Sequence, residues 1–360
     1  MPALVEAQLR HAQYYAEVLY AADRMYQTGH ESLAHGLELF DREWANILIG
    51  QTWSAANAQT LAVAATLCCE YPERGAYCLN LRQSPQERVV WLEEALQAVR
   101  QLQNRYAEGN LLGKLGLAYA DLGDVSRAID LHQARLKVAA EINDAEGYTA
   151  GLINLGIACD LVGQPAQGII LLNQALELAR QRGEKRAEGS ALGNLGMAYA
   201  AQEQYALAVD YHTQHLSIAR EMGDRRAASN ALTNLGFAYR KLGEPQRAIE
   251  YYQQSLLISR ALGNRKAEAQ DLGSLGLTYE ALGDLPQACL FYAQRLAIAQ
   301  QIGDQRGMAI AHWNWGEACI KSGGIEEGLR HLDAAVEIER ALNDPVAEQD
   351  AAQVAQLRAQ

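Results

Sequence analysis

The clearest pattern in the chain is the spacing of apolar residues between residues 227 and 266. In the first half of this segment they recur at three- and four-residue intervals, at Ala231, Leu232, Leu235, Ala238, Tyr239 and Leu242. This spacing places them on one side of a helix and is typical of an amphipathic α-helix. Gly243 follows them, and glycine readily adopts the left-handed conformation that ends a helix. We therefore predict a helix that ends near Gly243.

The second half of the segment repeats the pattern after a short turn. Glu244 and Pro245 stand at its start, and proline is tolerated in the first turn of a helix because the N–H group that it lacks has no partner there. The predicted inner face comprises Ala248, Ile249, Tyr252, Leu256 and Ser259. Gly263 and Asn264 are predicted to close this helix. The segment thus predicts two helices joined by a short turn.

The helix pair recurs with a strict period of 40 residues. A Leu-Gly pair, replaced once by Trp-Gly, stands at 115–116, 155–156, 195–196, 235–236, 275–276 and 315–316. Glycine also recurs at the predicted end of the first helix, at Gly123, Gly163, Gly243, Gly283 and Gly323, whereas one unit has Glu203 there. Because Glu in a left-handed conformation costs about 1 kcal/mol relative to glycine, we predict a weak junction at Glu203.

Small residues occupy two further columns of the repeat. Gly236 and Ala248 are predicted to let the two helices of a pair touch, with Tyr239 and Leu256 filling the space beside them. One pair cannot bury its apolar faces alone, so neighbouring pairs must stack into a continuous core. The composition agrees, since the chain has 62 Ala but only 7 Pro and 3 Phe, and Ala is the strongest helix former. The predicted fold is an all-α solenoid of antiparallel helix pairs.

The order of these residues resembles the tetratricopeptide repeat (TPR), with a Leu-Gly pair, a Tyr three residues later and an Ala nine residues beyond that. The usual unit has about 34 residues, and the 40-residue form is similar to the repeats of Pins-type scaffolds and of the C-terminal sensor regions of bacterial STAND signalling ATPases. The resemblance covers six units at 107–346 and, in degenerate form, 67–106. It implies a right-handed superhelical, TPR-like solenoid.

The two ends of the chain differ from the repeats. Residues 1–66 have a helical pattern without a clear repeat, and segments 10–15 and 40–48 are similar to the stretch that joins the ATPase half of STAND proteins to their TPR sensor. This resemblance implies that the chain is the sensor half of such a protein. Residues 347–360 are predicted to form one more helix, either as a cap on the array or at the boundary of a longer chain.

Charge and composition argue against several functions. The net charge of -12 disfavours a duplex nucleic-acid binder, which needs a basic surface. No apolar run approaches about 18 residues, so no membrane span is expected, and the N-terminus lacks the features of a signal peptide. The six cysteines are irregularly spaced, which predicts no disulfide framework. We therefore expect a cytoplasmic protein.

No motif for catalysis or metal binding stands out. Residues 109–115 approximate a phosphate-binding loop but have one residue too few between the glycines and no Ser or Thr after the lysine. His212 and His215 are one helical turn apart, yet no third ligand is indicated, so an exposed or groove-lining pair is expected. Cys68 and Cys69 lie in a predicted helix, where packing is the expected role. We predict no enzyme, no cofactor and no metal site.

The TPR resemblance implies that the first helices of successive pairs line a concave groove. The position before each Leu-Gly or Trp-Gly pair then faces inward and is mostly an amide: Lys114, Asn154, Asn194, Asn234, Ser274 and Asn314. Asn is a poor helix former, and its amide both donates and accepts hydrogen bonds. In peptide-binding TPR proteins an Asn in this slot clamps the main chain of the ligand. Two interpretations stay open. Either these side chains contact a ligand, or they form hydrogen bonds to a neighbouring helix and space the repeats.

An apolar column lies two residues after each Leu, at Leu117, Ile157, Met197, Phe237 and Leu277, with Glu317 in the last unit. These side chains either form an apolar strip in the groove, suited to an amphipathic helix or an extended peptide, or they complete the core between repeats.

Charge is distributed unevenly along the repeats. Residues 227–266 carry six basic and two acidic residues, whereas 267–306 carry two and five, and 307–360 carry four and nine. An acidic segment or a carboxylate would suit the basic unit, because Arg pairs with carboxylates bidentately. The alternative is a solvated basic face that balances its acidic neighbours. The candidate contact patch comprises Asn194, Asn234, Phe237, Arg240 and Lys241.

The leading hypothesis is a non-catalytic module that binds a protein or peptide segment in the groove. The resemblance refines this module to the ligand sensor of a STAND-type ATPase. Two alternatives stay open. One is a free-standing scaffold for protein assembly, and the other is a small-molecule sensor in which Trp313 and Trp315 stack on a sugar.

Overall fold

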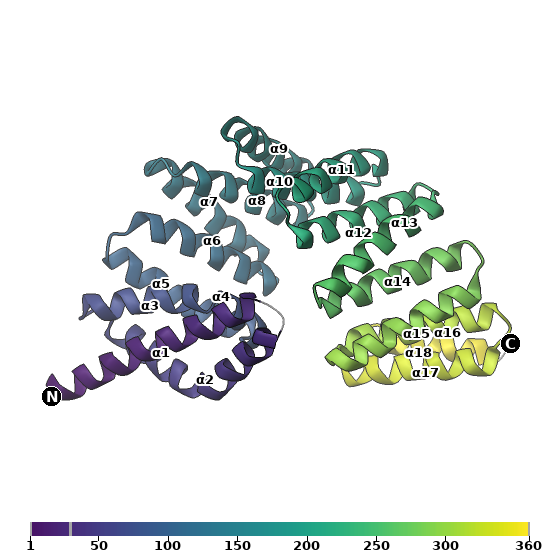
Figure 1. Cartoon of the computed structure of the whole chain (residues 1–360), viewed down its shortest axis with the longest axis horizontal. Coiled ribbons are helices and arrows are strands. Elements are labelled where there is room, and N and C mark those ends of the chain that lie inside the picture. Colours follow the sequence, from purple (N-terminus) through teal and green to yellow (C-terminus); the bar gives the residue numbers. More distant parts are fainter. Residues whose placement is uncertain (1, 29–30, 359–360) are drawn as a thin grey trace. The chain divides into compact units, whose positions relative to one another are not determined.

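The computed structural model describes residues 2–28 and 31–358 of the chain. Throughout this part the regular structure consists of eighteen α-helices without a strand. The helices group into two compact units, residues 1–187 and 188–360. Within each unit, helices that follow one another along the chain pack together (Figure 1). The predicted all-α, TPR-like class is confirmed.

The first unit begins with a long helical hairpin in which α1 and α2 pack along each other. A cluster of aromatic rings fixes the hairpin to later helices. The Trp44 ring stacks between Phe40 and Trp91, with centroid distances of 5.1 and 5.7 Å. The helices here are α1 (Pro2–Thr28), α2 (Glu31–Asn57), α3 (Ala62–Arg74), α4 (Ala76–Arg82) and α5 (Pro85–Gln101).

Regular helix pairs occupy the rest of the first unit and the second unit up to residue 341, and a single helix follows them. The first helices of successive pairs begin 40 residues apart, as the sequence period requires. The first unit continues with α6 (Arg105–Asp121), α7 (Val125–Glu141), α8 (Ala145–Leu161) and α9 (Pro165–Arg182). The boundary of the units falls near the start of α10 (Lys185–Ala201), and the second unit continues with α11 (Tyr205–Glu221), α12 (Arg225–Lys241), α13 (Pro245–Ala261), α14 (Arg265–Ala281), α15 (Leu285–Ile302), α16 (Gln305–Lys321), α17 (Ile325–Ala341) and α18 (Ala347–Arg358).

The predicted helix ends are present where the sequence placed them. Gly243 follows α12 with φ of 77°, and the N–H of Glu244 donates to the carbonyl of Tyr239 at 2.9 Å, which closes the helix in a Schellman motif. Glu203 occupies the equivalent position with φ of 60°. It therefore adopts the left-handed conformation that the other units give to glycine.

The prediction that Gly263 and Asn264 close α13 is confirmed, because the N–H of Asn264 donates to the carbonyl of Ser259 at 2.9 Å. The helix ends before Gly263, which has φ of 64°. Asn264 also begins the next helix, because its side chain accepts a hydrogen bond from the N–H of Ala267 at 3.2 Å. One short turn thus ends one helix and caps the next.

The glycine of each Leu-Gly pair makes room for a large side chain of the second helix. A Cβ atom added to Gly236 would lie 2.7 Å from the ring of Tyr252. Where both positions are glycine, as at Gly156 and Gly168, the backbones themselves come close, since a Cβ atom added to Gly168 would lie 2.7 Å from the carbonyl oxygen of Gly156. In three other pairs a ring faces the glycine, at His132, His212 and Tyr292, whereas Gly316 faces both Leu332 and the backbone of Gly328.

The prediction of an exposed or groove-lining histidine pair is also wrong. His212 is buried against Gly196 and His215 is half-buried beside Gly193. Burial lowers the pKa of His212 to about 4 and also lowers the pKa of His215, because a charged ring would lose its hydration there. Both rings are therefore packing groups between α10 and α11.

The paired cysteines pack within α3, as predicted. Cys68 is buried, and the Cys69 thiol lies 3.4 Å from the carbonyl oxygen of Ala95. Burial raises the pKa of the Cys69 thiol to about 11, so it is a poor nucleophile. At the other end of the chain, α18 packs on α17 through Ala347 and Val354. Across the described helices, none is both long and apolar enough to span a membrane.

Candidate binding surface

The surface of interest is a row of side chains on the first helices, which we name the first-helix row. It comprises the residues one before, two after and six after the Leu or Trp of each Leu-Gly or Trp-Gly pair. On a helix these three positions lie on one side and away from the buried Leu. The row is described separately for each unit.

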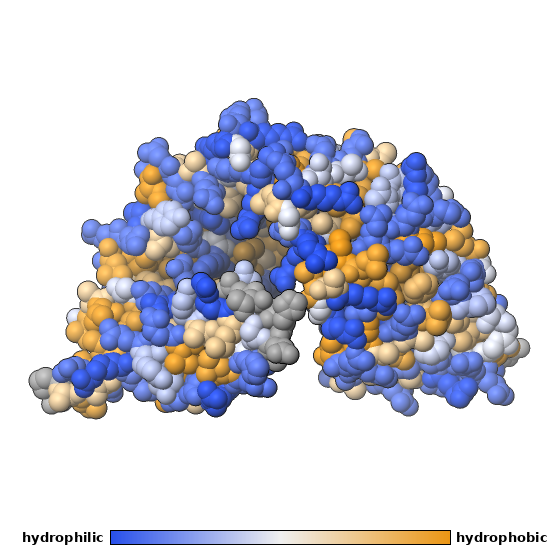
Figure 2. All heavy atoms as spheres, in the orientation of Figure 1, coloured by the Kyte–Doolittle hydropathy of each residue, from blue (hydrophilic) through white to orange (hydrophobic). Residues whose placement is uncertain are grey.

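The apolar column of the row faces solvent. The exposed fractions are 47% for Leu117, 49% for Met197, and 37% for both Phe237 and Leu277. A core role between repeats would bury these side chains, so that alternative is wrong for these four residues. In the second unit, apolar residues gather over α12–α14 in the space-filling view (Figure 2). Exposed apolar side chains that recur in register are typical of surfaces that bind a partner.

The amide column beside it is half-buried. Asn154, Asn194, Asn234 and Asn314 take equivalent places in α8, α10, α12 and α16. The Asn194 amide donates to the carbonyl of Ser190 in its own helix at 2.8 Å. This hydrogen bond stays within α10, whereas the spacer interpretation would require a hydrogen bond from Asn194 to a neighbouring helix. The structure places these amides as a periodic row and not as one cluster.

Two basic residues of α12 lie around one aromatic ring. The Arg240 guanidinium carbon lies 5.6 Å and the Lys241 ammonium 5.8 Å from the centroid of the Phe237 ring, within the range of cation–π attraction. Arg240 also lies beside Tyr252, where its hydrogen bond opposes the rise that burial causes in the pKa of the Tyr252 hydroxyl. Neither cation forms an ion pair within the described residues. Together with Asn234, they make a basic, partly apolar patch.

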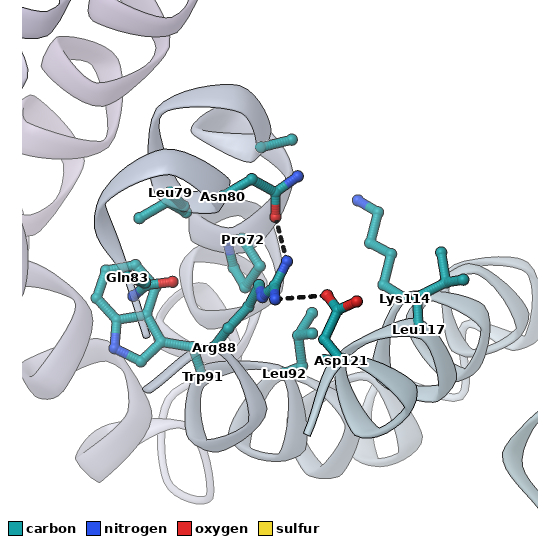
Figure 3. Close-up of a pocket in the computed structure, with 12 residues that line it drawn as sticks. Pro72, Leu79, Asn80, Gln83, Arg88, Trp91, Leu92, Lys114, Leu117 and Asp121 are labelled. Carbon is teal, nitrogen blue, oxygen red and sulfur yellow. Dashed lines mark hydrogen bonds and ion pairs between the residues drawn. The ribbon is translucent and has the colours of Figure 1, made fainter. Parts of the chain in front are cut away.

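The first unit carries a pocket of about 330 Å³ between α4, α5 and α6 (Figure 3). Three of its lining residues, Lys114, Leu117 and Asp121, belong to the first-helix row of α6. Trp91 and Leu92 of α5 form part of its apolar wall. The pocket therefore belongs to the same surface.

The polar side of this pocket centres on Arg88. Its guanidinium donates to the Asn80 side-chain oxygen at 2.8 Å and to the Asp121 carboxylate at 2.7 Å, as the dashed lines in Figure 3 mark. The Lys114 ammonium lies 3.3 Å from the carboxylate of Glu73. Sequence reasoning identified Lys114 but missed Asn80 and Arg88. The repeat is degenerate there and lacks the Leu-Gly pair from which the inward-facing positions of the other units are counted.

The tryptophans considered for sugar stacking lie off the first-helix row. Trp315 stacks on His331 with a centroid distance of 4.0 Å, and Trp313 packs beside Leu332 in the core of the last pair. His331 and His312 approach through their Nδ1 atoms at 2.9 Å. These rings thus contact side chains of the second helix of their own pair. No cluster of three or more His, Cys, Asp or Glu side chains suited to a metal ion occurs in the part of the chain that the structure describes.

The fold and the first-helix row define an all-helical repeat protein with a periodic exposed face. Family profiles described as tetratricopeptide repeat match residues 111–146, 148–221 and 227–301, about half of the chain. The chain belongs to the tetratricopeptide repeat family. A sequence search of curated proteins found no match.

Solved structures share this fold. A STAND protein with a tetratricopeptide repeat sensor from Pyrococcus horikoshii is similar over 97% of the chain, with a TM-score of 0.63 and 17% identity, and the chain spans 55% of the length of that protein. Aspartyl phosphate phosphatase F from Bacillus subtilis has a TM-score of 0.62 and 11% identity, over 92% of this chain and 94% of its own. The Rap conjugation gene regulator of the plasmid pLS20, solved in complex with the Phr* peptide, has a TM-score of 0.61 and 14% identity, over 92% and 97%. At these identities the likeness establishes the fold.

Proposed function

We propose that the chain is a non-catalytic TPR module that binds a protein or peptide segment along the first-helix row. The exposed apolar column is the observation that carries this proposal, because Leu117, Met197, Phe237 and Leu277 leave apolar surface in water in strict register. The neighbouring amides offer both donors and acceptors to a peptide backbone. A peptide with apolar residues flanked by acidic ones complements Phe237, Arg240 and Lys241.

The likeness to the peptide-bound Rap regulator supports this proposal at the level of the fold. The likeness to the STAND protein supports a finer one, in which the chain is the ligand-sensing region of a signalling ATPase. The six cysteines are free thiols, which suits the reducing cytoplasm. Reading the coding sequence upstream of Met1 tests the finer proposal, since a phosphate-binding loop there would support it and an unrelated gene would oppose it.

Peptide selection tests the main proposal. The full chain is incubated with a synthetic library of twelve-residue peptides that have free C-termini, and retained peptides are identified by mass spectrometry. The affinity of the best peptide is then measured by fluorescence anisotropy for the wild type and for a double variant, Asn234→Ala with Lys241→Glu. We expect the variant to bind at least tenfold more weakly, because it loses a main-chain partner and reverses a charge beside Phe237.

A matched control keeps the result specific to the row. Lys266→Glu makes the same charge reversal at an exposed position in the first turn of α14. We expect it to bind like the wild type, and both variants to keep the helical circular dichroism spectrum. Equal affinity of the double variant and the wild type would refute binding at this patch.

A further inference from the structure

The turns between successive helix pairs form an edge of the second unit that the first-helix row does not include. At three of these turns the residue before the left-handed glycine is apolar, and the second residue of the following helix is basic. Both columns keep the 40-residue period along α12, α14 and α16. We name this surface the turn edge. It comprises Met222, Leu262, Ile302, Arg226, Lys266 and Arg306.

The apolar column of the turn edge is open to solvent. Met222 is 39% exposed, Leu262 42% and Ile302 41%. The turns themselves close through backbone hydrogen bonds, such as the one from the N–H of Asp224 to the carbonyl of Ala219 at 2.9 Å. Ending these helices therefore does not require an apolar side chain before the glycine, and its recurrence in register points to a partner that covers it.

The basic column is exposed as well, and none of its members forms an ion pair within the described residues. Arg226, Lys266 and Arg306 stand in the first turn of their helices. A cation at this place faces the positive end of the helix dipole, which costs about 0.3–1 kcal/mol. The first turns of α12 and α16 hold no acidic residue that would offset this cost. Helix stability therefore does not explain the basic column.

The first unit shows how such a cation is neutralised elsewhere in the chain. Arg105, in the first turn of α6, is paired with the carboxylates of Glu108 and Glu141. The residues that correspond to these two acids three repeats later are Ala228 and Ala261. Arg225, which corresponds to Arg105, thus adds a further unpaired charge beside the basic column. The turn edge is locally positive although the chain has a net charge of -12.

Helix packing sets the spacing of the turn edge. Helix α12 contacts α14, and α14 contacts α16, and packed helices lie about 8–10 Å apart. A polypeptide in the polyproline II conformation has three residues per turn and a rise of about 3.1 Å per residue. Every third side chain of such a segment therefore lies on the same side, about 9 Å from the last. This repeat matches the spacing of the helices, whereas a β-strand repeats its facing side chains about every 7 Å.

We propose that the turn edge binds an acidic segment of a partner protein in the polyproline II conformation, with a carboxylate at every third residue and apolar residues between. The carboxylates pair with the basic column, and the apolar residues cover the apolar column. A nucleic-acid strand would leave the apolar column uncovered, and the net charge of -12 opposes its approach. A membrane is flat, whereas successive pairs of a solenoid are rotated relative to one another. The turn edge is a second surface and does not rest on the proposed function.

Peptides of defined spacing test this proposal on the full chain. The probe repeats Pro-Leu-Asp four times between an acetyl group and an amide, and its affinity is measured by fluorescence anisotropy. One control peptide has Asn in place of Asp, and the other has the composition of the probe in shuffled order. We expect the probe to bind about tenfold more tightly than either control and to weaken as salt is added. Equal affinity of the probe and the Asn peptide, or of the probe and the shuffled peptide, would overturn the proposal.

Variants of the chain locate the binding. Arg226→Glu with Lys266→Glu should weaken binding of the probe about tenfold, and its melting temperature should stay or rise because acids suit the first turn of a helix. Lys137→Glu with Lys241→Glu is the matched control, since it makes the same change in net charge at exposed positions away from the turn edge, and it should bind like the wild type. Leu262→Gln should weaken binding about threefold, because apolar contact is lost.

The remaining outcomes separate this surface from other partners and from the first-helix row. Vesicles of anionic lipid or an oligothymidylate that bind the wild type but not the turn-edge variant, in the absence of probe binding, would overturn the assignment to an acidic segment. The turn-edge variant should keep its affinity for the peptide selected on the first-helix row. Conversely, Asn234→Ala with Lys241→Glu should bind the Pro-Leu-Asp probe like the wild type, so failure at one surface is measured apart from failure at the other.

Discussion

Asp271 of α14 is a carboxylate buried in the core of the second unit, and its burial yields the sharpest prediction. The side chain is 1% exposed and accepts hydrogen bonds from Thr233 at 2.8 Å and Ser259 at 3.1 Å. Ser255 links to the same network through Thr233 at 2.8 Å. Burial raises the pKa of Asp271 to about 6, and the charge of Glu268 adds to the rise, although the hydroxyl hydrogen bonds oppose it.

The substitution Asp271→Asn removes the charge and keeps the shape. Below a pH of about 4 the carboxyl is protonated in both states and carries no penalty. As the pH rises from about 4 to about 6, the unfolded chain releases the proton while the folded chain retains it, so the free energy of unfolding falls. Once the pH exceeds the folded-state pKa of about 6, the full cost of the buried charge is present. It amounts to roughly 3 kcal/mol at most, given the ordinary pKa of 3.8 for an Asp side chain. The new amide nitrogen must find a hydroxyl acceptor, which offsets part of this relief. We therefore expect Asp271→Asn to raise the free energy of unfolding by about 1–2 kcal/mol at pH 8.

Urea unfolding of the full chain at pH 8 and pH 4.5 measures this effect, and hydrogen exchange of α12–α14 locates it. The gain should be present at pH 8 and largely absent at pH 4.5. Asp210→Asn is the matched control, because Asp210 is exposed on α11 and its substitution should leave stability within about 0.5 kcal/mol at both values. A loss of stability at pH 8 would refute the reasoning, since it would show that the ionised carboxylate stabilises the fold.

Three further predictions concern the repeats. Glu203→Gly should raise the stability of its unit by about 1 kcal/mol, because φ of 60° suits glycine; a turn at Glu203 as protected from hydrogen exchange as its neighbours would contradict this. Gly236→Ala should lower the free energy of unfolding, measured in urea, by about 1–3 kcal/mol, because its Cβ would lie 2.7 Å from the Tyr252 ring. Adding Tyr252→Leu should recover part of this loss. No recovery would show that the clash lies elsewhere. The His212 ring should show no NMR titration between pH 8 and pH 5.5, since burial lowers its pKa to about 4. The stability that this neutral ring confers should be lost as the pH falls from about 6.5 towards 4. A titration midpoint near pH 6.5 would contradict the burial of the ring.

Much of the fold could be predicted because local chemistry repeats in register. Gly243 and Pro245 define helix ends through backbone conformation alone, so a single sequence suffices to place them. The failures occur where a residue's role depends on its partner. His212 was expected to be exposed or to line the groove because no third metal ligand is indicated, but the opposing glycine, Gly196, leaves a space that the ring fills. The spacing of apolar residues predicts neither the buried ring nor the space that the opposing glycine leaves for it.

The binding surface was predicted only in part, for the same reason. Met197 and Phe237 follow from their register positions, since the repeat fixes which side of the helix they occupy. The pocket does not, because Asn80 and Arg88 belong to the degenerate pair, where Pro72 and the helix break remove the register. Irregular segments are read from three-dimensional packing and not from spacing.

The unvarying repeat length has a consequence for how such a chain changes over generations. A duplication or deletion of one whole unit shifts neither the reading frame nor any glycine relative to the ring that it accommodates. On the proposed function, the length of peptide that the first-helix row can hold is therefore adjustable in steps of one unit. The hydroxyls of 227–266 are an exception, because Thr233 and Ser259 serve the carboxylate of the following unit. Recombination between these two units would leave a buried acid without its donors, so we expect them to be inherited together.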